Sequence, residues 1–151
     1  MRIEPYGPAH RAGCLALFDG NAEPFFAPHE RVLLERFVES PLAASFSVAV
    51  LDTTVVGCGG IEAVGAGIWK LRWGMVRRDL HGRHLGARLL VHRIDTIRRR
   101  DPSARSVLLD TTRHSAGFYE RFGFTVTSVT PGGFTDGLDT VQMARRLDRD
   151  G

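Results

Sequence analysis

The alternation of apolar and polar residues divides the chain into short strands and amphipathic helices. In the N-terminal third it predicts a strand over residues 2–6 and two helices over residues 9–18 and 29–39, whose apolar side chains recur at helical spacing. Residues 19–21 (Asp-Gly-Asn) and the aromatic, proline-containing stretch 23–28 are typical of loops. A strand followed by two helices therefore opens the predicted fold.

The middle of the chain predicts three antiparallel strands and then a long helix. Residues 46–51 and 54–62 are rich in β-branched and small side chains and flank Asp52-Thr53, which predicts a hairpin with a tight turn. Residues 68–77 alternate apolar and basic side chains, as a third strand would. Residues 84–100 follow the period of an amphipathic helix. The apolar face of that predicted helix consists of Ala87, Leu90, Val91, Ile94 and Ile97.

The C-terminal third predicts a strand, a short helix and two further strands. Residues 106–110 contain a continuous apolar run, which is typical of a strand buried on both faces beside a helical crossover. Residues 115–122 predict a short helix that ends at Gly123, because glycine readily adopts a left-handed cap. Two strands, over residues 124–130 and 140–147, surround a glycine-rich loop. This order predicts an α/β fold with a central mixed sheet of about six to seven strands, partly parallel in its centre and flanked by helices.

The composition agrees with a single domain spanning residues 1–151. Hydrophobic residues make up 43% of the chain and charged residues 25%, which excludes collagen-like, disordered and disulfide-stapled classes. Cys14 and Cys58 lack the spacing of metal ligands, so we expect reduced core cysteines and no metal. The sequence predicts neither a membrane span nor a signal peptide, and we therefore expect a cytoplasmic protein with no membrane partner.

Positive charge is concentrated in one stretch of the chain. The formal net charge is +3, but residues 70–105 hold eleven Lys or Arg and three Asp, a local net charge of +8. Such a segment indicates an anionic partner, either a phosphate-bearing small molecule or a nucleic acid, although a solvated helix face has the same composition. Residues 83–105 do not interleave aromatic with basic side chains, so no stacking surface for nucleic acid is predicted.

A glycine-containing loop joins the predicted strand 68–77 to the helix that begins near His84. Unpaired backbone amides at a helix N-terminus, together with the helix dipole, favour a pyrophosphate there. Gly82 and Gly86 would let an anion approach the backbone, and Arg83 adds positive charge. The loop lacks the Gly-Lys-Ser/Thr of a P-loop and the Gly-x-Gly-x-x-Gly of a dinucleotide site, which argues against nucleotide hydrolysis and hydride transfer. By itself, such a loop is at least as typical of a helix that binds no ligand.

Two linked motifs, the loop over residues 81–86 and the segment over residues 118–124 (Phe-Tyr-Glu-Arg-Phe-Gly-Phe), resemble those of the GNAT N-acetyltransferase superfamily. That family carries a loop of pattern Arg/Gln-x-x-Gly-x-Gly/Ala after its fourth strand and, one strand later, a helix that ends Phe-Tyr-Glu-Lys-x-Gly-Phe. Residues 118–124 (Phe-Tyr-Glu-Arg-Phe-Gly-Phe) match the helix ending, and residues 81–86 occupy the loop. The predicted order of strands and helices also follows the family's arrangement. The chain departs from the loop pattern where His81 replaces Arg/Gln and His84 replaces the first Gly.

The resemblance implies transfer of an acetyl group from acetyl-CoA to a primary amine of a small molecule or peptide, within one ternary complex. It implies that backbone amides around Gly74 polarise the thioester carbonyl and that Tyr119 protonates the departing thiolate. The residues that the resemblance assigns to coenzyme A are Met75, Val76, His81, Gly82, Arg83, His84, Leu85, Gly86, Ala87 and Thr112.

The motifs do not specify the acceptor or the catalytic base. Glu62, at the end of its predicted strand, is the best carboxylate candidate for a base, and a solvated strand end accounts for it equally well. Acceptor identity depends on variable loops. Loop residues that either border the acceptor or simply serve the fold are Phe25, Phe26, His114, Phe134, Asp136 and Asp139.

Two other functions stay open from the sequence. A GNAT-like module that binds acyl-CoA without turnover is suggested by His84 and by Thr112, which stands where the family often has Asn, whereas Tyr119 argues for catalysis. A nucleic-acid-binding domain is suggested by residues 70–105, but without interleaved aromatic residues we expect no nucleic-acid partner. The sequence is compatible with a homodimer.

Overall fold

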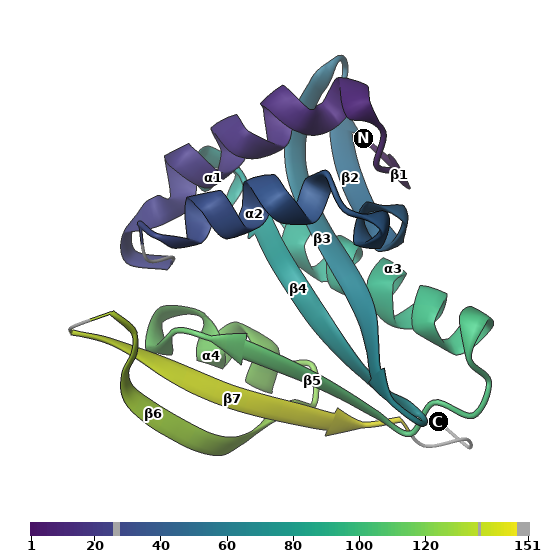
Figure 1. The fold of residues 1–151 in the computed structure, drawn as a ribbon, viewed down its shortest axis with the longest axis vertical. Helices are drawn as coiled ribbons and strands as arrows, with labels where there is room; N and C mark the ends of the chain where they lie inside the picture. The colour runs from purple at the N-terminus through teal and green to yellow at the C-terminus, as the bar shows by residue number, and fades with distance from the viewer. Residues whose placement is uncertain (26–27, 136, 148–151) are drawn as a thin grey trace.

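The computed structural model describes residues 1–25, 28–135 and 137–147, which form a seven-stranded sheet flanked by helices (Figure 1). The strands are β1 (Arg2–Pro5), β2 (Phe46–Leu51), β3 (Thr54–Gly65), β4 (Ile68–Val76), β5 (Ser106–Thr111), β6 (Thr125–Thr135) and β7 (Leu138–Arg146). The α-helices are α1 (Arg11–Phe25), α2 (Glu30–Val38), α3 (Leu85–Arg100) and α4 (Arg113–Glu120). Short 3-10 turns are η1 (Pro8–His10), η2 (Pro41–Ser45) and η3 (Arg78–Leu80).

The strand order is β1-β2-β3-β4-β5-β7-β6, and every neighbouring pair is antiparallel except β4 and β5. Backbone pairing between β4 and β5 joins residues 68–70 to residues 106–108. Both strands continue beyond this short seam, and they separate as they do so (Figure 1). On its other edge β5 pairs with β7. The carboxyl ends of β4 and β5 therefore diverge within the sheet.

Helices cover both faces of the sheet. α1 and α2 lie side by side across the N-terminal strands (Figure 1), where Phe18 and Leu34 are buried against β2. Adjacent β2 residues Val48 and Ala49 belong to different clusters, because successive side chains of a strand point to opposite faces. Ala49 packs with Leu89 of α3. α3, the crossover between the two parallel strands, thus covers the face opposite α1 and α2.

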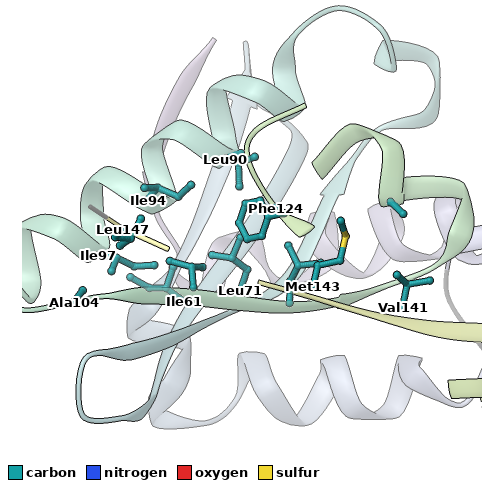
Figure 2. Packing of buried hydrophobic residues seen from close by; sticks show 13 residues of the cluster. Ile61, Leu71, Leu90, Ile94, Ile97, Ala104, Phe124, Val141, Met143 and Leu147 are labelled. Atoms are coloured by element: carbon teal, nitrogen blue, oxygen red, sulfur yellow. The ribbon is translucent and has the colours of Figure 1, made fainter. Parts of the chain in front are cut away.

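A hydrophobic cluster beneath α3 spans the short seam. Figure 2 shows Leu90, Ile94 and Ile97 of α3 facing Ile61 and Leu71, which come from β3 and β4. The same cluster takes in side chains from β5 and from the chain that follows it, namely Val107, Leu109, Phe124, Val141, Met143 and Leu147. Side-chain burial, more than backbone pairing, therefore joins the two halves of the sheet.

The structure confirms the predicted mixed α/β fold, but three predicted loops are wrong in whole or in part. The expected loop over residues 19–21 is helical, and so are residues 23–25 of the expected loop over residues 23–28, since α1 continues to Phe25. The Asn21 side chain donates a hydrogen bond to the carbonyl of Leu17 at 2.9 Å, and Leu17 and Phe18 are buried, so tertiary contacts outweigh the weak helix propensity of Gly and Asn. In the C-terminal hairpin, β6 and β7 extend through most of the expected glycine-rich loop.

The buried face of α3 also differs from the prediction. Val91, which the sequence pattern places on the apolar face, is 49% exposed, whereas Arg93 is only 4% exposed. Leu89 is buried because Gly57 of β3 leaves room for it: a Cβ on Gly57 would lie 2.7 Å from its side chain. A buried arginine on this face is not expected from an apolar period alone.

Candidate functional site

A cavity of about 680 Å³ lies where β4 and β5 diverge. Its walls come from β4 residues 70–76, the carboxyl end of β5, the N-terminal half of α3 and the inward face of α4. Asn21 of α1, Glu30 of α2 and Phe134 of β6 also line it. We call this space the β4–β5 cavity. Both motifs that the sequence analysis singled out border it, through Gly82, Gly86 and Tyr119.

The N-terminus of α3 borders this cavity through His84, Gly86 and Ala87, and its first backbone amides have no helical acceptors. Arg88 is the first residue of α3 whose amide has a helical partner, the carbonyl of His84 at 3.1 Å. His84 is the N-cap residue, and its side chain makes no capping bond. The helix has no acidic residue in its first turn. These are the features of a helix terminus that binds an anion.

His84 adopts a left-handed backbone conformation, with φ of 64° and ψ of 8°. This conformation explains why glycine is favoured at this position of the loop pattern, because a Cβ is strained there. Gly82, with φ of 81°, takes a second left-handed position in the same loop. His81 closes the loop through a 2.7 Å hydrogen bond between its Nε2 and the Val76 carbonyl. The loop therefore keeps the expected backbone shape despite the histidine.

The carboxyl half of β4 contains a bulge that faces the cavity. The β3–β4 register moves from Cys58↔Met75 to Gly60↔Arg72, so Trp73 and Gly74 together lie opposite one β3 residue. Trp73 has φ of 54°, a strained value for an aromatic residue. We call these two residues the β4 bulge. A bulge interrupts the regular ladder of backbone hydrogen bonds, and this one brings the Gly74 backbone to the wall of the cavity.

Tyr119 reaches the β4 bulge from α4. A Cβ built on Gly74 would lie 3.3 Å from the Tyr119 hydroxyl oxygen, so the hydroxyl lies next to the bulge backbone. The ring is held edge-on by Phe118 and Phe124, with ring centroids 5.1 and 5.8 Å away. The tyrosine of the predicted motif therefore lines the cavity with its hydroxyl directed at β4.

A buried arginine lies under the same bulge, and the sequence analysis missed it. Arg93 Nη2 donates hydrogen bonds of 3.0 Å to the carbonyls of Gly60 and Arg72. Burial lowers the pKa of Arg93, and the nearby Tyr119 opposes that effect. Two features of the sequence could have indicated this buried arginine. One is an arginine within the apolar face of a helix. The other is the Gly-Cys-Gly-Gly run of β3, which lacks the side chains that would otherwise occupy the space of the guanidinium.

The structure brings together seven of the ten residues assigned to coenzyme A and leaves three outside the cavity lining. The residues that line the cavity are Met75, Val76, His81, Gly82, His84, Gly86 and Ala87. Arg83 and Leu85 are not among the lining residues: Arg83 is exposed, and Leu85 packs against the cluster that contains Ala49 and Leu89. Thr112 is 1% exposed, caps α4 and does not line the cavity, and its Oγ1 has no partner among the described residues.

Glu62, the carboxylate proposed as a base, lies outside the cavity lining and accepts a 2.8 Å hydrogen bond from Arg72 Nε. Two other carboxylates line the cavity. Asp110 pairs with Lys70 at 2.8 Å, and Glu30 projects from the first turn of α2 with only 9% of the residue exposed. Helix α2 thus supplies an acidic group that the sequence analysis did not single out.

Of the loop residues considered for the acceptor site, some line the cavity and others stabilise the fold. His114 and Phe134 line the cavity. Asp139 instead fixes the β6–β7 hairpin, because it accepts hydrogen bonds from Arg113 Nε at 2.9 Å and from the Gly132 amide at 3.0 Å. Phe25 belongs to α1, and Phe26 and Asp136 lie outside the described residues.

Both cysteines are buried and free, as predicted. Burial raises the pKa of the Cys58 thiol well above its usual range, and the thiol donates to the Trp73 carbonyl at 3.4 Å. Within residues 1–25, 28–135 and 137–147, no group of three His, Cys, Asp or Glu side chains is placed to hold a metal ion. No helix in these residues combines the length and apolar character that crossing a bilayer requires.

Solved structures share this fold over nearly the whole chain. Ard1 from Thermoplasma volcanium superposes with a TM-score of 0.82 at 17% identity, with 97% of each chain covered. The Escherichia coli ribosomal-protein-S18-alanine N-acetyltransferase gives 0.78 at 17% identity, covering 99% of this chain and 96% of that one. An aminoglycoside 6'-N-acetyltransferase complexed with coenzyme A gives 0.79 at 16% identity, with 99% of each chain covered. A mixed sheet opened between two parallel strands is thus a fold that this chain shares with acetyltransferases.

The family model described as "Acetyltransferase (GNAT) domain" matches residues 21–147. The chain therefore belongs to the GNAT acetyltransferase family. No curated protein sequence matches the chain.

Proposed function

We propose that this protein is an N-acetyltransferase that takes its acetyl group from acetyl-CoA and transfers it to a primary amine of a small molecule or peptide. One observation carries the proposal. The Tyr119 hydroxyl lies beside the β4 bulge, inside the same cavity that begins at the anion-binding terminus of α3. A proton donor, backbone amides beside the reacting carbonyl and an anion site in one cavity are what thioester aminolysis requires.

The residues of the cavity fit the parts of acetyl-CoA. The first amides of α3 suit a pyrophosphate, Gly82 has open space where a side chain would be, and Gly86 lets Phe118 pack close to the start of the helix. Residues 71–76 of β4 have no β5 partner, which leaves a strand edge suited to the two amides of a pantetheine chain. When bound, the donor supplies an acetyl thioester, whose carbon is open to attack by an amine.

In the proposed reaction, the amine nitrogen bonds to the thioester carbon and the C–S bond breaks, with its electron pair passing to sulfur. Backbone amides at the β4 bulge stabilise the negative charge that develops on the carbonyl oxygen. Tyr119 donates its proton to sulfur, and the acetylated nitrogen loses a proton to solvent or to a carboxylate. The protein thus stabilises charge at both ends of the breaking bond.

The acceptor enters, we infer, from the side of α1 and α2. Glu30 lines that side of the cavity, and a carboxylate there attracts a cationic amine and can receive its proton. The other lining carboxylate, Asp110, lies on the β5 side, where it pairs with Lys70. Among the similar structures are an aminoglycoside acetyltransferase and a ribosomal-protein alanine acetyltransferase, which supports both a small-molecule and a peptide acceptor.

The first test is a thermal-shift titration with acetyl-CoA, coenzyme A, NAD and a short DNA duplex. Because a ligand that binds the native state raises its stability, acetyl-CoA and coenzyme A should raise the Tm while NAD and DNA leave it unchanged. Stabilisation by DNA that disappears with added salt would instead support nucleic-acid binding.

The second test is thiol release from acetyl-CoA with kanamycin, an alanine-initial hexapeptide and spermidine as acceptors. The Tyr119→Phe variant should lower kcat by about 100-fold while keeping its affinity for coenzyme A. Binding without thiol release for any amine would favour a module without turnover, and an unchanged kcat would remove Tyr119 from the mechanism.

A further inference from the structure

The Arg93 guanidinium bridges β3 and β4 at the end of the β4 bulge. Its Nη2 donates to the carbonyls of Gly60 and Arg72, both at 3.0 Å, and these two residues are register partners across the strands. The next β4 residues are the strained Trp73 and then Gly74. The planar guanidinium therefore links the two strand backbones at the point where the bulge interrupts their regular pairing.

The chain leaves space for this cation by omitting side chains on both strands. A Cβ on Gly59 would lie 2.6 Å from Arg93 Cζ and Nε, and a Cβ on Gly74 would lie 2.8 Å from Arg93 Nη1. Real Cβ contacts are essentially never that short. The glycine residues of the bulge and of the facing strand are thus matched to the arginine.

The same guanidinium borders the proton donor of the proposed reaction. Arg93 and Tyr119 meet at Gly74. A Cβ built on Gly74 would lie 2.8 Å from Arg93 Nη1 and 3.3 Å from the Tyr119 hydroxyl oxygen. Arg93 Nη2 donates to neutral carbonyls, and its Nε has no partner among the described residues. Arg93 is 4% exposed, so little solvent screens its charge. Within the part of the chain that the structure describes, no carboxylate pairs with this positive charge at the cavity floor.

We propose that Arg93 is a positioning residue for acetyl transfer, which holds the β4 bulge in shape and stabilises the phenolate that Tyr119 becomes when it gives its proton to sulfur. The inference rests on the proposed function. In the balanced step, the C–S electron pair and the Tyr119 proton both pass to sulfur, and the phenolate oxygen keeps the O–H electron pair until solvent returns a proton. A fixed cation beside that oxygen lowers the energy of the charged state and costs no reorganisation.

The test compares Arg93→Met, which removes the charge at similar length, with Arg93→Lys, which keeps it. Arg99→Met is the matched control, because Arg99 lies on the same helix but is exposed and hydrogen-bonds Thr96. Thiol release from acetyl-CoA gives kcat and KM, with the kanamycin, hexapeptide and spermidine panel and with water alone as acceptors. Arg93→Met should lower kcat by about 30-fold with KM for acetyl-CoA changed less than about 3-fold. Arg93→Lys should restore kcat to within about 5-fold of wild type, whereas a merely structural loss would not be rescued by charge.

A double-mutant cycle with Tyr119→Phe separates this inference from the proposed function. If Arg93 acts through the tyrosine, Arg93→Met should slow the Tyr119→Phe enzyme by no more than about 3-fold. A full loss of about 30-fold in that background would overturn the phenolate role of Arg93 while leaving Tyr119 catalytic. Should Tyr119→Phe itself have wild-type kcat, the proposed proton donor is wrong and the phenolate role falls with it.

Amide hydrogen exchange provides a readout that needs no turnover. In Arg93→Met, amides of residues 73–75 should exchange at least about 10-fold faster than in wild type and in Arg99→Met, because the bulge loses its bridge. Unchanged exchange there would overturn the positioning role, whether or not the wild-type protein releases thiol. If Arg93→Met does not fold, the same comparison is made with Arg93→Lys, which should show an intermediate rate; a wild-type rate would count against the inference.

Discussion

Gly74→Ala adds one methyl group at the point where Arg93 and Tyr119 meet the β4 bulge. The new Cβ would lie 2.8 Å from Arg93 Nη1 and 3.3 Å from the Tyr119 hydroxyl oxygen. Gly74 is not among the glycines with positive φ, so alanine can adopt its backbone conformation and the effect is one of space. Arg93 cannot simply swing away, because its Nη2 is held by two carbonyls.

The cost of this methyl group has two parts. Overpacking of a buried site lowers the free energy of unfolding by about 1–3 kcal/mol. A shift of the Tyr119 hydroxyl by a few tenths of an ångström lowers kcat by about 10-fold, since misplacement by about 1 Å costs about 100-fold. Urea denaturation followed by tryptophan fluorescence measures the first part, and thiol release from acetyl-CoA measures the second.

Gly117→Ala is the matched control for Gly74→Ala. Gly117 lies in α4, two residues before Tyr119, and a Cβ added there would meet no neighbouring atom within 4 Å among the described residues. Alanine there should raise the free energy of unfolding by about 0.5–1 kcal/mol and leave kcat unchanged. Equal stability and equal kcat for the Gly74→Ala and Gly117→Ala proteins would refute the reasoning, because it would show that the bulge has room to spare.

Three further substitutions test other parts of the structure. His84→Gly relieves the left-handed backbone strain at the start of α3. Urea denaturation should show that the free energy of unfolding rises by about 0.5–1 kcal/mol, and calorimetry should show tighter binding of acetyl-CoA. A loss of stability would mean that the imidazole contributes more than its strain costs. Gly20→Ala lies within α1 with open space around it and should stabilise the protein by about 0.5–1 kcal/mol, whereas a loop at this position would gain nothing from alanine. The Gly132 amide and Arg113 lower the pKa of Asp139. At pH values above the usual pKa of an aspartate, this carboxylate therefore stabilises the folded protein, and the stabilisation is lost as the pH falls through the lowered pKa of the folded state. The difference in unfolding free energy between neutral pH and a pH of about 3 should therefore be smaller in Asp139→Asn, and an undiminished difference would contradict the assignment.

Local sequence patterns predicted the parts of this molecule that depend on local rules. The end of the helix that carries Tyr119 follows a sequence motif that closes with Gly123 and Phe124. The two strands on either side of Asp52 follow the residue preferences of a hairpin with a tight turn. Both features were therefore found in the sequence. The extension of α1 was not, because residues 19–21 are poor helix formers and only the burial of Leu17 and Phe18 keeps them helical.

The geometry of the candidate site depended on contacts between distant segments, which periodicity does not report. Arg93 looks like a break in the apolar face of α3 until Gly59 and Gly74 are seen opposite it. The strained Trp73 has the sequence environment of an ordinary strand residue, and its bulge follows from the register of β3. The base candidate Glu62 was chosen by its position on a strand, but its carboxylate is engaged by Arg72.

The short seam between β4 and β5 has a consequence for the lifetime of the protein. Only residues 68–70 and 106–108 join the two halves of the described sheet through the β4–β5 backbone, and the rest of the join is the cluster beneath α3. A donor molecule that pairs with the unpaired edge of β4 while contacting α4 would bridge the two halves of the sheet, as an additional strand would. By mass action, binding of the proposed donor, acetyl-CoA, should then raise the resistance of the protein to proteolysis.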